Sequence, residues 1–253
     1  MVAAASKGLG LAIAETLASE GARVSIGSRR QQAISEVAKK IQNETSSRVI
    51  GYELDVTSPE SITEWCRSTV RDFGKIDGLV VNAGGPPAGG FDQFDDESWR
   101  KAFDLTLLSA VRLIRGVLPS MREQKSGVIL TLTSSSIKEP IDGLILSNVF
   151  RSGVNSLVKS LSRELSTYGI RINNIVPGRI DTDRVQSLDS INANKAGISQ
   201  GQQRELQEKL IPLSRYGQPK EFGKAATFLL SDAASYVTGT TLIVDGGKTK
   251  AIG

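Results

Sequence analysis

The stretch VAAASKGLGLAIAETLASEGARVSIGSRR, residues 2–30, decides the fold of this chain. It passes through a turn containing Gly8 and Gly10, continues with helical spacing over residues 9–19, and ends in an apolar strand at residues 23–26. A glycine-rich turn that runs into a helix lets the backbone approach a phosphate, and the helix N-terminus offers unpaired N–H groups. Such a turn is also an ordinary strand-to-helix connection, so the rest of the chain must decide.

The same alternation of strand and helix patterns continues almost to the C-terminus. Apolar β-branched runs predict strands at residues 23–26, 48–54, 76–81, 127–133, 170–176 and 241–244. Helical spacing predicts helices at residues 9–19, 31–43, 59–73, 97–122, 147–168 and 219–230. This order is typical of the α/β class, with one Rossmann-like, doubly wound parallel sheet and helices on both faces. We therefore expect residues 1–253 to form a single dinucleotide-binding domain.

Two segments depart from this regular pattern. Only residues 1–3 precede the first turn, so we expect either a first strand truncated by a shortened or misassigned start, or an unusually short central strand. Residues 183–211 are polar and rich in Gln, Ser and Asn, which predicts a lid-like insertion beside the substrate pocket. A solvated loop without a role is the alternative for this insertion.

The composition excludes several kinds of chemistry. Cys66 is the only cysteine and the chain has no histidine, so a Ser-His-Asp triad, an imidazole base and a cysteine or histidine metal site are excluded. We expect no bound metal. No apolar run is long enough for a membrane helix and no signal sequence is visible, so we expect a cytoplasmic protein that does not bind membranes.

The charge balance points to a small-molecule partner. The chain has 31 basic and 27 acidic side chains, a net charge of +4, and 5% aromatic residues, with no concentrated basic run. Nucleic-acid binding would need a basic stripe with interleaved aromatics, so we do not expect it. A mildly basic site for a phosphorylated small molecule fits better.

A basic segment follows the second predicted strand. Ser28, Arg29 and Arg30 stand about 20 residues after the glycine-rich turn, where an acidic residue would bind the ribose 2′-hydroxyl of NAD. Arg29 together with Lys7 suits a 2′-phosphate instead, which predicts NADP(H) as the preferred cofactor and leaves NAD(H) as an option. Solvated surface arginines are the alternative interpretation.

From the first turn to the C-terminus, the chain resembles the short-chain dehydrogenase/reductase family. Residues 3–10 are similar to the family's Thr-Gly-x-x-x-Gly-x-Gly turn, with Ala3 and Ala4 in place of its Thr and first Gly. The further matching segments are Asp55-Val56, Asn82-Ala83-Gly84, Asn174-Ile175-Val176-Pro177-Gly178, Arg215-Tyr216-Gly217-Gln218-Pro219, Val237-Thr238-Gly239 and Val244-Asp245-Gly246-Gly247. The chain is identified as an atypical member similar to the 3-oxoacyl-acyl-carrier-protein reductases.

This resemblance implies a set of cofactor-binding residues along the predicted strand ends. They are Ser6, Lys7, Gly8, Leu9, Gly10, Ser28, Arg29, Arg30, Asp55, Val56, Asn82, Ala83, Gly84, Arg151, Pro177, Gly178, Ile180 and Thr182. The resemblance also implies a homo-oligomer, a dimer or tetramer, formed through the helix at residues 147–168 and the last strand and helix.

The catalytic positions are where the chain departs from the family. Members use an Asn, a Ser and a Tyr-x-x-x-Lys pair, in which Tyr gives the proton and Lys holds the ribose. Ser134 matches the Ser, but Ser147 and Arg151 stand where Tyr and Lys belong, and Thr106 stands at the Asn position. A serine hydroxyl is a much weaker acid than a phenol, and a guanidinium does not readily release its proton.

Three functions are compatible with this departure. The first is an NADP(H)-dependent oxidoreductase acting on a small carbonyl or alcohol substrate, with Arg151 stabilising a developing alkoxide and water between Ser134 and Ser147 supplying the proton. The second is a cofactor-binding protein without carbonyl reductase activity, a redox sensor or scaffold. The third is a different reaction on the same fold, such as dehydration or isomerisation.

Overall fold

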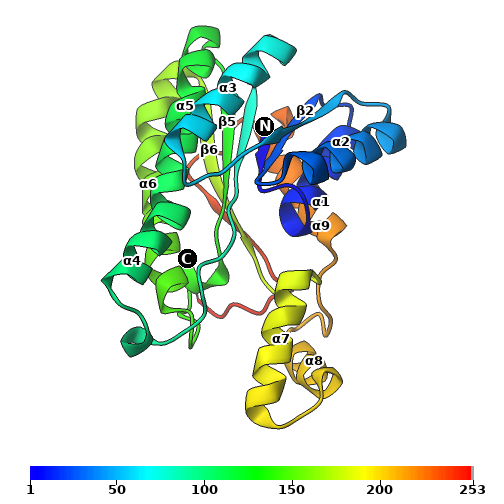
Figure 1. The fold of residues 1–253 in the computed structure, drawn as a ribbon, viewed down its shortest axis with the longest axis vertical. Helices are drawn as coiled ribbons and strands as arrows, with labels where there is room; N and C mark the ends of the chain where they lie inside the picture. The colour runs from blue at the N-terminus through cyan, green and yellow to red at the C-terminus, as the bar shows by residue number, and fades with distance from the viewer. Residues whose placement is uncertain (252–253) are drawn as a thin grey trace.

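Seven parallel strands form one sheet in the order β3-β2-β1-β4-β5-β6-β7 in the computed structural model, which describes residues 1–251 (Figure 1). The strands are β1 (Val2–Ala3), β2 (Val24–Ser28), β3 (Val49–Glu53), β4 (Gly78–Val81), β5 (Gly127–Leu132), β6 (Ile170–Pro177) and β7 (Thr241–Val244). The chain builds outward from β1 through β2 to β3 and then returns to place β4 on the other side of β1. The strand order therefore reverses between β1 and β4, where α/β sheets bind ligands.

Helices cover both faces of the sheet, as the sequence predicts. The α-helices are α1 (Gly8–Ser19), α2 (Gln31–Thr45), α3 (Pro59–Phe73), α4 (Asp96–Phe103), α5 (Ser109–Gln124), α6 (Ile145–Leu165), α7 (Asp183–Ala196), α8 (Gln200–Lys209) and α9 (Pro219–Leu230). Shorter helical turns are η1 (Phe91–Gln93), η2 (Asp104–Leu108), η3 (Ser135–Ile137), η4 (Ser166–Tyr168) and η5 (Asp232–Ala234). Helices α1, α2 and α9 lie on one face and α3, α5 and α6 on the other (Figure 1).

Each face has its own apolar core. Ile13, Ile34 and Phe222, from α1, α2 and α9, belong to one buried cluster. Trp65 and Leu113, from α3 and α5, belong to the other. Most residues of the five inner strands, from β2 to β6 across the sheet, are buried, whereas the edge strands β3 and β7 are largely only partly buried.

The boundaries of α3 show how local sequence sets an element. The Ser58 hydroxyl accepts a hydrogen bond from the Ser61 N–H at 3.1 Å, and Pro59 occupies the first helical position. Both features favour a helix start, because they satisfy or remove an unpaired donor. Gly74 ends the helix with φ +86°, a conformation that glycine adopts without strain.

The structure differs from the sequence prediction in the middle helix and shows how the insertion is built. The predicted helix at residues 97–122 is two α-helices joined by the π-helical turn η2 (Asp104–Leu108). Residues 183–211 do not form a loop, since they contain α7 and α8, which extend from one end of the sheet (Figure 1). Their helices begin at capping side chains, Thr182 and Ser199, so local polar residues stabilise them despite a weak apolar pattern.

The first strand is short and lies at the centre of the sheet. Val2 pairs with Ile26 on one side and Val80 on the other. A cavity of about 250 Å³ lies at the N-terminal end of β1, lined by residues of β2 and β4 that include Val24 and Gly78. Strand β1 has only two residues, so the expectation of a short central strand is met.

Candidate active site

The predicted site residues come from the C-terminal ends of the parallel strands. Ser6 to Gly10 follow β1, Ser28 ends β2 and Arg29 and Arg30 follow it, Asp55 and Val56 follow β3, Asn82 to Gly84 follow β4, and Pro177 ends β6. All strands run in the same direction, so these segments meet at one edge of the sheet. The edge lies at the strand-order reversal between β1 and β4, the expected position of a dinucleotide crevice.

The N-terminus of α1 is open to a ligand. Lys7, at the N-cap, makes no side-chain capping hydrogen bond, and the first turn of the helix contains no acidic residue. Gly8 has φ +61°, and a Cβ added there would meet no atom within 4 Å. An uncapped helix N-terminus beside open space binds phosphate well, because its N–H groups and the helix dipole both favour an anion. The residues present therefore fit the diphosphate of a dinucleotide.

Asn82 and Gly10 hold this turn in shape. The Asn82 amide donates to the carbonyl oxygens of Ala3 and Ala4, each at 3.3 Å. A Cβ at Gly10 would lie 2.5 Å from the Ala4 oxygen and 2.8 Å from Asn82 Nδ2. The close contact explains why glycine is required at this position, and it ties β4 to the turn after β1.

A second cationic position lies at the end of β2. Arg29 and Arg30 are exposed, and neither takes part in an ion pair within residues 1–251. Asp55, after β3, accepts hydrogen bonds from the N–H and hydroxyl of Thr57, which lower the pKa of its carboxyl group. Lys7 instead pairs with exposed Asp183 on α7 at 3.4 Å.

The segment after β6 connects the sheet to α7. A Cβ at Gly178 would collide with Asp245. Ile180 is buried, and Thr182 accepts a hydrogen bond from the Val185 N–H as the N-cap of α7. The predicted binding residues here thus also fix where α7 begins.

The four predicted catalytic residues lie on elements that pack together. Ser134 directly precedes η3, Ser147 and Arg151 lie one turn apart on α6, and Thr106 lies in η2. Helix α6 packs against both η2 and η3, and a Cβ at its Gly153 would be 3.0 Å from a methyl group of Leu107.

Arg151 provides a fixed positive charge at this position. Its Nη1 donates to the carbonyl oxygen of Leu132, at the end of β5, at 2.8 Å. Burial, reinforced by the positive charge of Arg184, lowers the pKa of the Arg151 guanidinium to about 10. The side chain therefore remains protonated at neutral pH and can stabilise a nearby negative charge.

Hydroxyl groups near this edge have spare hydrogen-bonding capacity. Thr106 Oγ1 and Ser136 Oγ are buried, and neither has a hydrogen-bond partner within the described part of the chain, residues 1–251. Thr106 lies in the π-helical turn, a feature frequent at functional sites because it interrupts the regular helix ladder. Ser134 Oγ accepts a hydrogen bond from the Ser136 N–H at 3.2 Å, and Ser147 is 8% exposed.

No tyrosine replaces the missing phenol at this edge. The Tyr52 hydroxyl donates to Asp72 at 2.7 Å, and the Tyr216 hydroxyl donates to Asp189 at 2.8 Å. Burial, followed by the hydrogen bond to the carboxylate, raises the pKa of both phenols. Tyr168 and Tyr236 are exposed.

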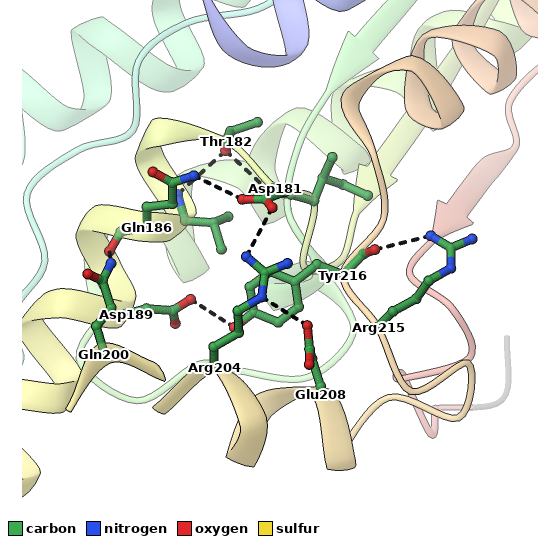
Figure 2. Close-up of polar contacts among 11 residues, drawn as sticks. Asp181, Thr182, Gln186, Asp189, Gln200, Arg204, Glu208, Arg215 and Tyr216 are labelled. Atoms are coloured by element: carbon green, nitrogen blue, oxygen red, sulfur yellow. Dashed lines mark hydrogen bonds and ion pairs between the residues drawn. The ribbon is translucent and has the colours of Figure 1, made fainter. Parts of the chain in front are cut away.

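A polar network that the sequence analysis missed joins α7 and α8 to the body (Figure 2). Buried Asp189 on α7 accepts hydrogen bonds from Tyr216 and Arg179. Arg204 on α8 pairs with Asp181 at 3.0 Å and lies 4.5 Å over the Tyr216 ring. Only the three-dimensional approach of these segments reveals the network, since its members are spread over residues 179–216 without a motif.

A second missed residue is Arg184, on the first turn of α7. Its Nη2 donates to the Pro86 carbonyl oxygen at 3.3 Å, beside the glycine-rich segment that follows β4. No sequence signal pairs residue 184 with residue 86, because their contact depends on how α7 crosses the edge of the sheet.

The fold defines a doubly wound α/β domain with a Rossmann-like parallel sheet. Residues 3–249 match the family model described as enoyl-(acyl carrier protein) reductase. The 3-oxoacyl-(acyl-carrier-protein) reductase of Escherichia coli (strain K12) is 34% identical over 247 residues, which cover 98% of this chain and 95% of that protein. The chain therefore belongs to the short-chain dehydrogenase/reductase family of oxidoreductases.

Solved structures agree with this assignment. L-Sorbose reductase from Gluconobacter frateurii, in complex with NADPH and L-sorbose, superposes with a TM-score of 0.94 at 30% identity, covering 99% of this chain and 96% of that one. An NADPH-bound short-chain oxidoreductase from Pseudomonas aeruginosa PAO1, described as containing an atypical catalytic center, gives a TM-score of 0.89 at 27% identity, with coverage of 99% and 96%. The neighbours thus include NADPH-bound enzymes.

Two absences apply to the described residues, 1–251. They contain no cluster of His, Cys, Asp and Glu side chains that could hold a metal ion. None of their helices is long and apolar enough to cross a membrane.

Proposed function

We propose that the protein is an NADP(H)-dependent oxidoreductase that transfers a hydride between the nicotinamide and a small carbonyl or alcohol substrate. The observation that carries this proposal is the cationic, uncapped edge formed by the α1 N-terminus and unpaired Arg29, with no acidic residue after β2. A dinucleotide with a 2′-phosphate is the ligand whose charges match both positions.

The chain offers a separate binding group for each part of this cofactor. The N–H groups of α1 suit the diphosphate, Arg29 and Arg30 suit the 2′-phosphate, and Arg151 suits the ribose hydroxyls near the nicotinamide. Ala83, Gly84 and the segment from Pro177 to Thr182 border the remaining length of the crevice.

The catalytic residues act on the substrate oxygen and its proton. When bound, the reduced nicotinamide supplies the hydride. As the carbonyl carbon gains the hydride, the electron pair of the C=O π bond moves to oxygen, and the positive charge of Arg151 stabilises the resulting alkoxide. The hydroxyls of Ser134 and Ser147 orient the substrate and a water molecule, which gives the proton and leaves hydroxide to solvent. Alcohol oxidation reverses each step.

A second candidate is an NADP(H)-binding protein without carbonyl reductase activity, such as a redox sensor or scaffold. The observation that favours it is that Ser147 stands where the family has Tyr, while the Tyr52 and Tyr216 hydroxyls are held by carboxylates, so the family's proton donor near pKa 10 is missing. A different reaction on the same fold, dehydration or isomerisation, is a third candidate and would give a different product.

Cofactor binding and turnover separate these functions. We expect NADPH to bind in a fluorescence titration, and NADPH oxidation to follow with at least one substrate of a carbonyl panel. The double variant Ser147→Tyr with Arg151→Lys restores the family pair and serves as the positive control. Absence of NADPH and NADH binding would refute the proposal. A silent wild type beside an active double variant would favour the sensor or scaffold.

Arg29 provides the test of cofactor choice. We expect Arg29→Ala to weaken NADPH binding by about 10- to 100-fold, the range for a lost charged hydrogen bond, and to leave NADH binding unchanged. Lys39→Ala, which removes an exposed charge from α2, is the matched control. Equal weakening of NADPH and NADH in Arg29→Ala would contradict the 2′-phosphate assignment.

We also propose a homo-oligomer, a dimer or tetramer, and a cytoplasmic location. The first rests on the resemblance to the family, and Val149 on α6 and Phe228 on α9, each 45% exposed, are candidate contact residues for it. Strand β7 is an edge strand of the sheet, which leaves its outer side open to pairing. The cytoplasmic location rests on the sequence alone.

A further inference from the structure

Two guanidinium groups at the site edge lack a counter-ion. Arg184 is exposed on the first turn of α7, and its Nη2 lies against the segment after β4, where a Cβ at Gly85 would be 3.1 Å away. Its hydrogen bond to the Pro86 carbonyl oxygen is long, at 3.3 Å, and the uncharged acceptor leaves the positive charge of Arg184 without a counter-ion. Within residues 1–251 neither Arg184 nor Arg151 forms an ion pair, and the neighbouring carboxylate, Asp183, pairs with Lys7.

The two groups belong to the same part of the edge. Arg151 is fixed to the Leu132 oxygen at the end of β5, and Arg184 lies over the segment that follows β4. Strands β4 and β5 are neighbours, with Val81 beside Thr131. The positive charge of Arg184 also contributes to the lowered pKa of Arg151, so the two cations interact across this space. Like charges without a partner are unfavourable, and an anion between them would relieve the repulsion.

The cofactor's phosphates have other positions in the crevice. The α1 N-terminus suits the diphosphate and Arg29 suits the 2′-phosphate, whereas the Arg151 end is where hydride transfer would occur. An anion here therefore belongs to the substrate. A carboxylate matches an arginine especially well, because its two oxygens accept two parallel N–H hydrogen bonds.

We propose that the substrate is an oxo acid or hydroxy acid, and that Arg184, beside Arg151, binds its carboxylate. This inference rests on the proposed function. Arg184 exchanges its weak contact with the Pro86 oxygen for a charged pair, which orients the carbonyl group toward Ser134 and Ser147. Arg184 is then a specificity-determining residue on α7, and the insertion at residues 183–211 contributes it to the site.

Matched acids and esters test this proposal. The probes are pyruvate, acetoacetate and levulinate with their methyl esters, because they place the carboxyl group at three distances from the ketone. We expect kcat/KM for at least one acid to exceed that for its ester by about 10-fold or more. Arg184→Met should remove this preference mainly through KM for the acid, and Arg184→Lys should keep part of it. Lys195→Met, at the other end of α7, is the control and should keep the preference.

Binding measurements separate failure of this inference from failure of the proposed function. Calorimetric titrations measure NADPH binding to wild type and Arg184→Met, and acid or ester binding with and without NADP⁺. Equal binding of acids and esters, or binding of neither, would overturn the carboxylate proposal. So would weakening of NADPH binding in Arg184→Met equal to that of acid binding, which would assign Arg184 to a cofactor phosphate. If the wild type does not bind NADPH, the proposed function is refuted. The carboxylate site is then tested by the titrations without NADP⁺: tighter binding of an acid than of its ester supports it, and equal or absent binding overturns it.

Discussion

At the scale of single residues, Ala4 has a backbone conformation that favours glycine. Its φ is +50°, in the glycine-rich turn between β1 and α1. The left-handed region costs a residue with a Cβ about 1 kcal/mol or more. Ala4 stands where the family motif has glycine. The turn therefore has a backbone conformation that suits glycine, but alanine occupies the position.

Replacing Ala4 by glycine should therefore stabilise the protein. We expect Ala4→Gly to raise the free energy of unfolding by about 0.5–1 kcal/mol, or Tm by about 2–3 °C, in a thermal melt. Ala5→Gly is the control, because Ala5 is fully buried and has no positive φ, and it should destabilise. A lower Tm for Ala4→Gly would show that relief of backbone strain does not dominate at this position.

At the scale of elements, α7 and α8 depend on a few polar contacts. The sequence of these helices is polar, and Asp189 and Gln203 are among their few buried residues. Asp189 joins α7 to Arg179 and Tyr216 of the body. Breaking a buried charged network by removing one partner is costly, because the other charge remains buried.

The position of α7 should therefore respond to the charge of Asp189. We expect Asp189→Asn to speed tryptic cleavage within α7 and α8 about 10-fold or more, with a smaller effect on global unfolding, because these helices extend from the sheet (Figure 1). Asp183→Asn on the same helix is the control, since its ion pair with Lys7 is exposed and contributes little. Equal cleavage of Asp189→Asn and wild type would show that the network does not hold the helices in place.

At the scale of the whole molecule, the exposed faces of α6 and α9 predict association. Val149 on α6 and Phe228 on α9 are both 45% exposed. We expect light scattering to give a mass of two or four chains of 27.1 kDa. Val149→Glu or Phe228→Glu should shift the protein to a smaller species, because burying an unpaired charge at an interface is costly.

A valine outside both faces provides the control for association. Val70 on α3 is 38% exposed, and Val70→Glu should leave the mass unchanged. A wild-type monomer would refute the proposed oligomer directly. Loss of mass in all three variants would indicate general destabilisation instead of a specific interface.

The sequence by itself determined the alternation of strands and helices, and with it the doubly wound sheet. Apolar strands between amphipathic helices can bury their faces in few other ways, so the pattern predicts the fold. It also predicts which segments meet at the edge, since the ends of parallel strands coincide there. The sequence pattern did not predict the π-helical turn at Thr106. A shift of one residue in the helix hydrogen bonds barely changes the spacing of apolar residues.

The tertiary structure alone decided what surrounds that edge. The polar composition of residues 183–211 predicted an insertion but neither its two helices nor its attachment through Asp189. The hydrogen bond from Arg184 to the Pro86 oxygen joins residues 98 positions apart in the sequence. The contacts of Arg179 and Arg204 with the Tyr216 ring also result from tertiary packing. Ion pairs and hydrogen bonds between distant segments leave no repeating pattern in the sequence. Only the folded structure therefore shows which of these side chains share a site.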